Sequence, residues 1–141
     1  MDVQINYLAV FLAAVSTMVV GSIWYAPSVF GKTWAKLAKV DLNRKVPASE
    51  MTWLMGSTFV ASIVTAYILA HVAFLSNSFF QNSFMQDTVS TAFWLWLGFT
   101  AARLYVHDAF ENRRKKLTVL AVCYEFVTIM LMAIIIGAFG Y

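Results

Sequence analysis

Two charged residues interrupt long apolar stretches of this chain, and their types suit them to proton or cation chemistry. Glu125 lies within the apolar stretch 117–140, and Arg103 lies close to the end of the stretch 88–106. Placing an ionised carboxylate at the centre of a bilayer costs about 2.5–3.5 kcal/mol on the milder insertion scales. We therefore expect Glu125 to be neutral, paired or in contact with water, and Arg103 is its natural partner because its long side chain spans a difference in depth.

The Glu125–Arg103 pair has two interpretations. In one, it is an interhelical ion pair that only holds two helices together. In the other, it is a proton or cation site on a permeation path, because charged residues inside membranes are commonly functional. Tyr25 and Tyr124 are predicted to form a polar wall beside this site. For Tyr25 the alternative is an aromatic belt at the membrane interface.

The composition indicates that these residues stand in a membrane protein. The chain has 141 residues, of which 61% are hydrophobic and only 12% are charged. Soluble domains are about half apolar and about a quarter charged. A soluble core of this size has no room for so much apolar surface, whereas a bilayer does.

Four apolar stretches are long enough to cross a bilayer, which takes roughly 20 helical residues. They cover residues 5–26, 51–75, 88–106 and 117–140. Backbone groups in lipid find no water, so each stretch must be helical. The sequence thus predicts an all-α integral membrane bundle of four transmembrane helices, forming a single domain over residues 1–141.

The basic residues predict the orientation of this bundle. All ten lie in or beside two of the loops: Lys32, Lys36, Lys39, Arg44, Lys45, Arg103, Arg113, Arg114, Lys115 and Lys116. Loops rich in Lys and Arg stay in the cytoplasm. We expect both basic loops to be cytoplasmic and both termini to lie outside, in a bacterial inner membrane or plasma membrane.

The segment 28–40 follows the first predicted span and is amphipathic. One helical face would carry Phe30, Trp34 and Leu37, and the opposite face would carry Lys32, Lys36 and Lys39. This pattern is typical of a short helix in the headgroup layer of a membrane. These six residues are predicted to contact lipid, either as an anchor that sets helix depth or as a lipid sensor.

Other site chemistries find little support in the sequence. His71 and His107 would lie at opposite membrane faces, and His107 with Glu111 offers two ligands where zinc usually takes four. We predict no metal, no cofactor and no catalytic residue. The run Arg113–Lys116 borders a span, so it is assigned to topology and lipid contact, and nucleic acid is not expected as a partner.

The segment 21–27, Gly-Ser-Ile-Trp-Tyr-Ala-Pro, with Phe30-Gly31-Lys32 and Trp34 after it, resembles the N-terminal signature of a known membrane family. That family is called domain of unknown function 1761, and the opening residues 5–10 are also similar to it. The resemblance covers almost the whole chain. It implies a small four-helix membrane protein and brings no assigned activity.

Two functions of different class follow. The first is a transporter or channel for a small molecule or ion, built as a homo-oligomer because four short helices enclose little space, with Glu125 as its binding carboxylate. The alternative is a structural or accessory membrane protein that binds lipid or a partner membrane protein without transport. An enzyme is disfavoured, because no nucleophile–base pair or metal cluster is visible.

Overall fold

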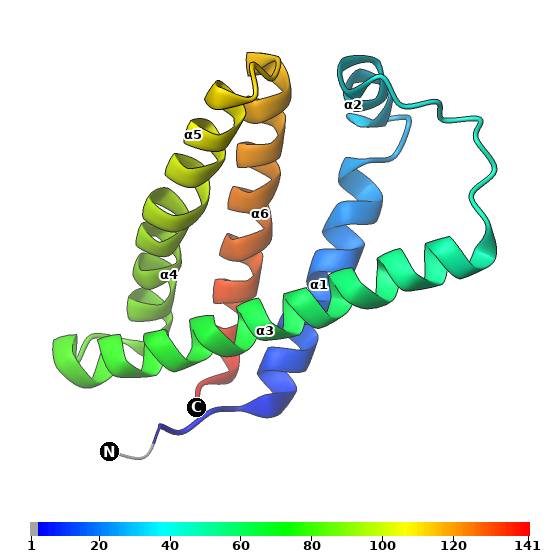
Figure 1. Cartoon of the computed structure of the whole chain (residues 1–141). Helices are drawn as coiled ribbons and strands as arrows, with labels where there is room; N and C mark the ends of the chain where they lie inside the picture. Colours follow the sequence, from blue (N-terminus) through cyan, green and yellow to red (C-terminus); the bar gives the residue numbers. More distant parts are fainter. Residues whose placement is uncertain (1–2) are drawn as a thin grey trace.

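The computed structural model describes residues 3–141, and every regular element in that range is a helix (Figure 1). Met1 and Asp2, the first residues of the predicted outer N-terminal tail, lie outside the described residues. The elements are α1 (Tyr7–Trp24), α2 (Gly31–Ala38), α3 (Ala48–Phe80), α4 (Phe84–Leu95), η1 (Trp96–Ala101), α5 (Ala102–Phe110) and α6 (Lys115–Phe139).

Three of these helices, α1, α3 and α6, are long and apolar enough to cross a membrane. They match the predicted stretches 5–26, 51–75 and 117–140. The expected single α-helix over 88–106 is corrected, because that stretch consists of α4, η1 and α5 in direct succession. The element η1 is a π-helix, in which backbone bonds reach one residue further than in an α-helix.

Helix α3 is longer than predicted and has 33 residues. At 1.5 Å per residue it extends about 50 Å, against about 30 Å for a hydrocarbon core. It lies across α1 and the α4–α6 pair, and its first turns project beyond them (Figure 1). Residues 48–58 are accordingly all exposed.

The core lies toward the end of the bundle where α1 begins and α6 ends. Small residues dominate it and let the helix backbones approach closely. Gly137 of α6 is one example: a Cβ there would lie 2.9 Å from the Cα of Met85 in α4. The buried members are Val10, Ala13, Ala66, Leu69, Ala70, Ala92, Met132, Ala133 and Ile136.

The helix expected at 28–40 is shorter in the structure, where α2 covers Gly31–Ala38. A tight turn precedes it, and Pro27 has no backbone N–H to continue α1. Gly31 permits this turn, because a Cβ there would clash with the carbonyl oxygen of Tyr25. α2 therefore folds back and contacts α6 at the end of the bundle opposite the core.

Candidate functional site

A cavity of about 320 Å³ lies between α1, α3, η1 and α6, and Glu125 is part of its wall. Its other lining residues are mostly hydroxyl-bearing. The polar lining consists of Thr17, Thr58, Ser62, Thr65, Thr100, Tyr124, Glu125 and Thr128. Ala61, Ile129 and Met132 supply the apolar part of the wall. Among the residues lining this cavity there is one carboxylate and no Lys, Arg or His.

Glu125 and Arg103 share a second hollow but form no ion pair. Arg103, Leu104 and His107 line this hollow, which has a volume of about 490 Å³, together with Glu125. Among residues 3–141, no nitrogen–oxygen pair within 4.0 Å joins Arg103 to Glu125. Arg103 is exposed, whereas Glu125 is half-buried. The carboxylate thus stands where two hollows meet.

The π-helix η1 shapes this junction. It carries Thr100, the only residue besides Glu125 that lines both hollows. The first residue of η1, Trp96, holds the segment against α6: its indole Nε1–H donates to the carbonyl oxygen of Val122 at 3.2 Å. The Trp96 ring also lies 4.7 Å from that of Phe126. Short π segments inside α-helices occur frequently at functional sites.

A hydrogen bond between α1 and α3 supports the other wall of the cavity. The Thr17 and Ser62 hydroxyl oxygens lie 2.8 Å apart. The other α3 hydroxyls bond along their own helix: Thr58 donates to the carbonyl oxygen of Leu54, and Thr65 donates to that of Ala61. These bonds fix where each hydroxyl oxygen lies along the wall.

Aromatic rings cover the cavity at the α2 end. Tyr124 lines the cavity, and its ring lies 5.3 Å from that of Tyr25 and 6.0 Å from that of Trp24. Tyr25 itself is not among the lining residues and forms a second layer behind Tyr124. Phe30 packs on Trp24 at 4.6 Å and Trp34 packs on Tyr25 at 5.4 Å. Of the two tyrosines predicted to form a polar wall, Tyr124 lines the cavity and Tyr25 does not.

Of the six residues expected to contact lipid, the three apolar ones pack against the bundle and the three lysines are exposed. Phe30 and Trp34 pack on the end of α1, as just described, and Leu37 is half-buried. Lys32, Lys36 and Lys39 are all exposed. The aromatic face of α2 thus binds the bundle and its basic face points away from it.

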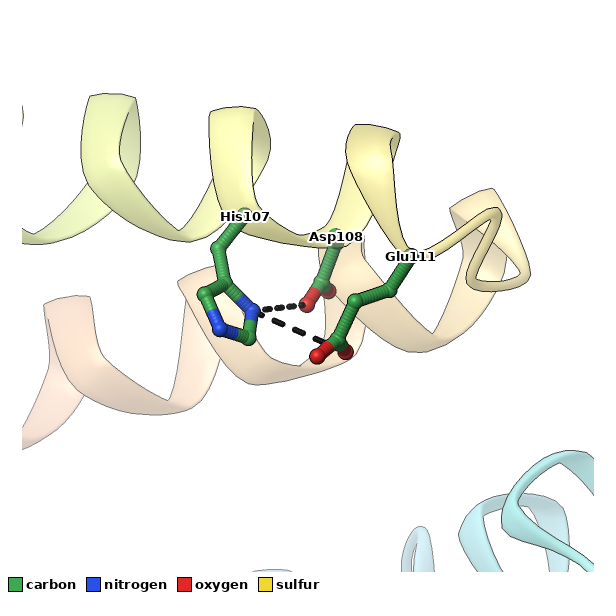
Figure 2. A group of neighbouring side chains, drawn as sticks. All are labelled: His107, Asp108 and Glu111. Carbon is green, nitrogen blue, oxygen red and sulfur yellow. Dashed lines mark ion pairs between the residues drawn. The ribbon is translucent and has the colours of Figure 1, made fainter.

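The last turn of α5, before the connection to α6, contains a buried aspartate that sequence reasoning missed. Asp108 lies beside His107 and Glu111, whose side chains approach one another on the same helix (Figure 2). The Thr118 hydroxyl donates to Asp108 at 2.6 Å and the Arg113 guanidinium donates at 3.2 Å. Burial acts to raise the pKa of Asp108, but these two hydrogen bonds, together with the charges of Arg113 and His107, outweigh it and the pKa is lowered.

His107, Asp108 and Glu111 are close enough together to hold a metal ion. However, each carboxylate oxygen of Asp108 already accepts one of the hydrogen bonds just described, so Asp108 serves the turn. His107 Nδ1 lies 3.6 Å from the Glu111 carboxylate, a contact between exposed side chains. We assign this cluster to the stability of the turn.

A second buried aspartate, Asp87, stabilises the turn between α3 and α4. The Asn82 and Asn77 side-chain amides donate to its two carboxylate oxygens at 2.9 and 2.8 Å. These bonds lower the pKa of Asp87. Asp87 and Asp108 lie at the two ends of the predicted third span, and this placement in the sequence could have identified both aspartates.

Sequence reasoning found Glu125 but not the hydroxyls around it. The hydroxyl residues that line the cavity were not predicted as site residues: Thr17, Thr58, Ser62, Thr65, Thr100 and Thr128. For the hydroxyls of α3 the sequence does contain a signal: they recur at positions 58, 62 and 65, which is helical spacing.

Over residues 8–137 the chain matches the family model described as "Protein of unknown function (DUF1761)". The match covers nearly the whole chain and includes the segment around Trp24 and Trp34 that carries the resemblance. No curated protein and no solved structure matches the chain.

Proposed function

This chain belongs to the DUF1761 family, and we propose that it is an integral membrane transporter or channel that uses Glu125 as an intramembrane binding carboxylate. One observation carries the proposal: Glu125 lines a polar cavity without an ion pair to Arg103. An acidic side chain inside a membrane is costly, so a fold that keeps one beside a cavity has a use for it.

The proposed membrane arrangement has four crossings. Residues 88–106, which run through α4, η1 and α5, form the third, beside α1, α3 and α6. The α2 end and the α5–α6 turn carry the basic residues, so we place them in the cytoplasm and the termini outside. Labelling a cysteine introduced at Asn82, with Cys123 replaced, tests this orientation. Reaction only from the cytoplasmic side would overturn it.

The two hollows that meet at Glu125 suit a transport cycle. The 320 Å³ cavity lies within the helices, and the other hollow extends toward His107 at the proposed cytoplasmic end. A carboxylate between two compartments can exchange a proton or cation with each in turn. The π segment supplies a place where the helix can change its hydrogen bonding as this happens.

We also propose that the exposed basic face of α2 contacts the membrane surface. Lys32, Lys36 and Lys39 would meet anionic headgroups at the cytoplasmic surface, each contributing about 1 kcal/mol. Binding of the chain to additional anionic lipid in nanodiscs should weaken when the three are replaced by Gln. Unchanged lipid preference would remove α2 from lipid binding.

We also propose that several copies assemble, because the first turns of α3 present Trp53, Leu54 and Met55 without protein cover. Native mass spectrometry in detergent measures this directly. A chain that stays monomeric at membrane-like concentrations would contradict it.

Reconstitution into proteoliposomes tests the transport function. With a potassium diffusion potential as the driving force and a pH dye inside, the wild-type chain should conduct protons well above empty vesicles. Glu125→Gln should lower the rate at least tenfold, whereas Glu111→Gln, at the exposed end of α5, should leave it unchanged. Equal flux in wild type and Glu125→Gln would remove Glu125 from transport and favour the accessory function.

A further inference from the structure

The charge balance of the 320 Å³ cavity restricts what it can bind. Its lining holds one carboxylate, Glu125, and no basic side chain. Arg103 lies on the other hollow, exposed and beyond ion-pair distance. Away from bulk water an unbalanced charge is strongly unfavourable, so an ionised Glu125 requires one positive charge from the bound molecule. A dication would leave an excess charge, and an anion would double the negative one.

The hydroxyls restrict the ligand further. Each of Thr58, Ser62, Thr65 and Thr128 donates its proton to the carbonyl oxygen four residues earlier, over 2.7 to 3.0 Å. A hydroxyl has one proton and two lone pairs, so these four groups have only acceptor positions left for a ligand. A monocation that also donates hydrogen bonds therefore fits these four groups best.

Volume separates an organic cation from a metal ion. The cavity of about 320 Å³ equals the space of about ten water molecules at about 30 Å³ each. Metal ions are held by oxygens at about 2.0 to 2.6 Å that converge on one point. Here the oxygens are spread over four helical elements, and Ala61, Ile129 and Met132 line the rest of the wall. That mixture suits a small molecule with a charged head and an apolar tail.

We propose that this cavity binds a small primary amine in its ammonium form. The ammonium group would bind the Glu125 carboxylate and donate to the hydroxyls of α3 and α6, and the tail would contact Ile129 and Met132. The Tyr124 ring in the wall offers a further cation–π contact. This inference rests on the proposed function, because it names the substrate class of the same site.

Calorimetric titration of the full chain in detergent tests the proposal with three probes that each carry a short alkyl tail. Butylammonium should bind. Butyltrimethylammonium has the same charge but no N–H donor, and should bind at least tenfold more weakly. Pentanol has no charge and should give no measurable binding. Equal binding of all three, or tighter binding of sodium chloride than of butylammonium, would overturn the proposal.

Variants locate the binding in the cavity. Glu125→Gln should weaken butylammonium binding at least tenfold, and Thr128→Val should weaken it about threefold to tenfold because one acceptor is lost. Ser57→Ala is the matched control, because Ser57 is an exposed α3 hydroxyl outside this cavity. This variant should bind butylammonium with the affinity of the wild type. If circular dichroism shows that Glu125→Gln is unfolded, the comparison of Thr128→Val with Ser57→Ala still tests whether butylammonium binds in the cavity. Equal weakening by both would overturn the site.

The flux assay separates this proposal from the one on which it rests. Glu125-dependent proton flux with no butylammonium binding would overturn the amine site and leave transport in place. Glu125-dependent butylammonium binding with no flux of protons or amine would support the site and overturn transport. Glu125-dependent binding together with butylammonium uptake would support both.

Discussion

The two halves of the bundle are built in opposite ways. Around the core residues Ala66, Met132 and Ala133, small side chains are buried and the helices touch; we call this the terminal half. Around Glu125 the helices leave two hollows, of which the 320 Å³ cavity is lined mainly by hydroxyls; we call this the α2 half. Only an aromatic layer centred on Tyr25 and Tyr124 covers it. The close packing is thus concentrated in one half, and the hollows with their carboxylate lie in the other.

This difference explains how a costly carboxylate is tolerated. Close packing of apolar side chains in the terminal half holds α1, α3, α4 and α6 together. The α2 half can then remain open without unfolding the chain. Substitutions that add volume should consequently have opposite outcomes in the two halves.

The largest expected effect is that of adding three carbons to a buried alanine. Ala133→Leu should lower the free energy of unfolding by about 1–3 kcal/mol, because overpacking a close-packed core forces the helices apart. Ala61→Leu makes the same change in the wall of the cavity, where there is space, and should change stability by less than about 0.5 kcal/mol. Thermal unfolding in detergent measures both. A larger loss for Ala61→Leu would contradict the comparison of the two halves.

A smaller effect is expected from the two glycines of α1 and α6. A Cβ on Gly137 would lie 2.9 Å from backbone of α4, whereas a Cβ on Gly21 would meet only the Tyr124 side chain, with its hydroxyl at 3.2 Å. Gly137→Ala should therefore destabilise the chain by about 1 kcal/mol or more. Gly21→Ala should be neutral or stabilising, because alanine has the better helix propensity and a tyrosine side chain can move. The same unfolding assay ranks them, and a reversed order would count against the packing described.

The smallest effect concerns the two buried aspartates at the turns. Both have a lowered pKa in the folded chain. Each therefore adds stability above its unfolded pKa, about 3.9, and this stability is lost as the pH falls from about 5 through the lowered pKa. Melting temperatures between pH 6 and pH 3 should fall less steeply in Asp87→Asn and in Asp108→Asn than in wild type. Parallel slopes in all three chains would contradict this account.

Salt should distinguish the two aspartates. Asp108 accepts a hydrogen bond from the Arg113 guanidinium, whose side chain is 40% exposed, whereas Asp87 is held by neutral amides. High salt screens the first interaction and leaves the second. The stability difference between wild type and Asp108→Asn should shrink in high salt, and that for Asp87→Asn should stay constant.

Hydropathy was sufficient to predict the bounds of α1 and α6. The stretches 5–26 and 117–140 differ from these helices by two residues or fewer, because Asn6 caps the start of α1, Pro27 follows its end and basic residues precede the apolar run of α6. For α3 the polar residues Ser76 and Asn77 ended the predicted stretch, yet the helix continues to Phe80. Polar residues end a hydropathy stretch without ending a helix. The π segment carries no sequence signal of this kind.

The site was predictable only in its charged member. Glu125 is conspicuous in an apolar stretch, whereas a threonine in a membrane helix is common and its hydroxyl usually bonds to its own helix. Which hydroxyls face a cavity depends on how α3 is rotated about its axis and on how steeply it crosses α1. Those quantities follow from the packing of Ala66, Leu69 and Ala70, not from local sequence pattern.

The π segment also has a consequence for how this helix can be altered. A π turn contains one more residue than an α turn, so deleting a single residue of η1 would restore an α-helix. Gly98 suits such a deletion, because the space beside it is open and a Cβ there would meet nothing within 4 Å. Everything after the deleted residue would keep its phase about the helix axis, because the same turn would then take one residue fewer. Conversion of η1 to an α-helix with all its residues kept would instead rotate everything after it by about 100°, and Arg103 and His107 would leave the hollow they share with Glu125. The π turn thus sets the phase of the helix beyond it, and so decides which residues face the site.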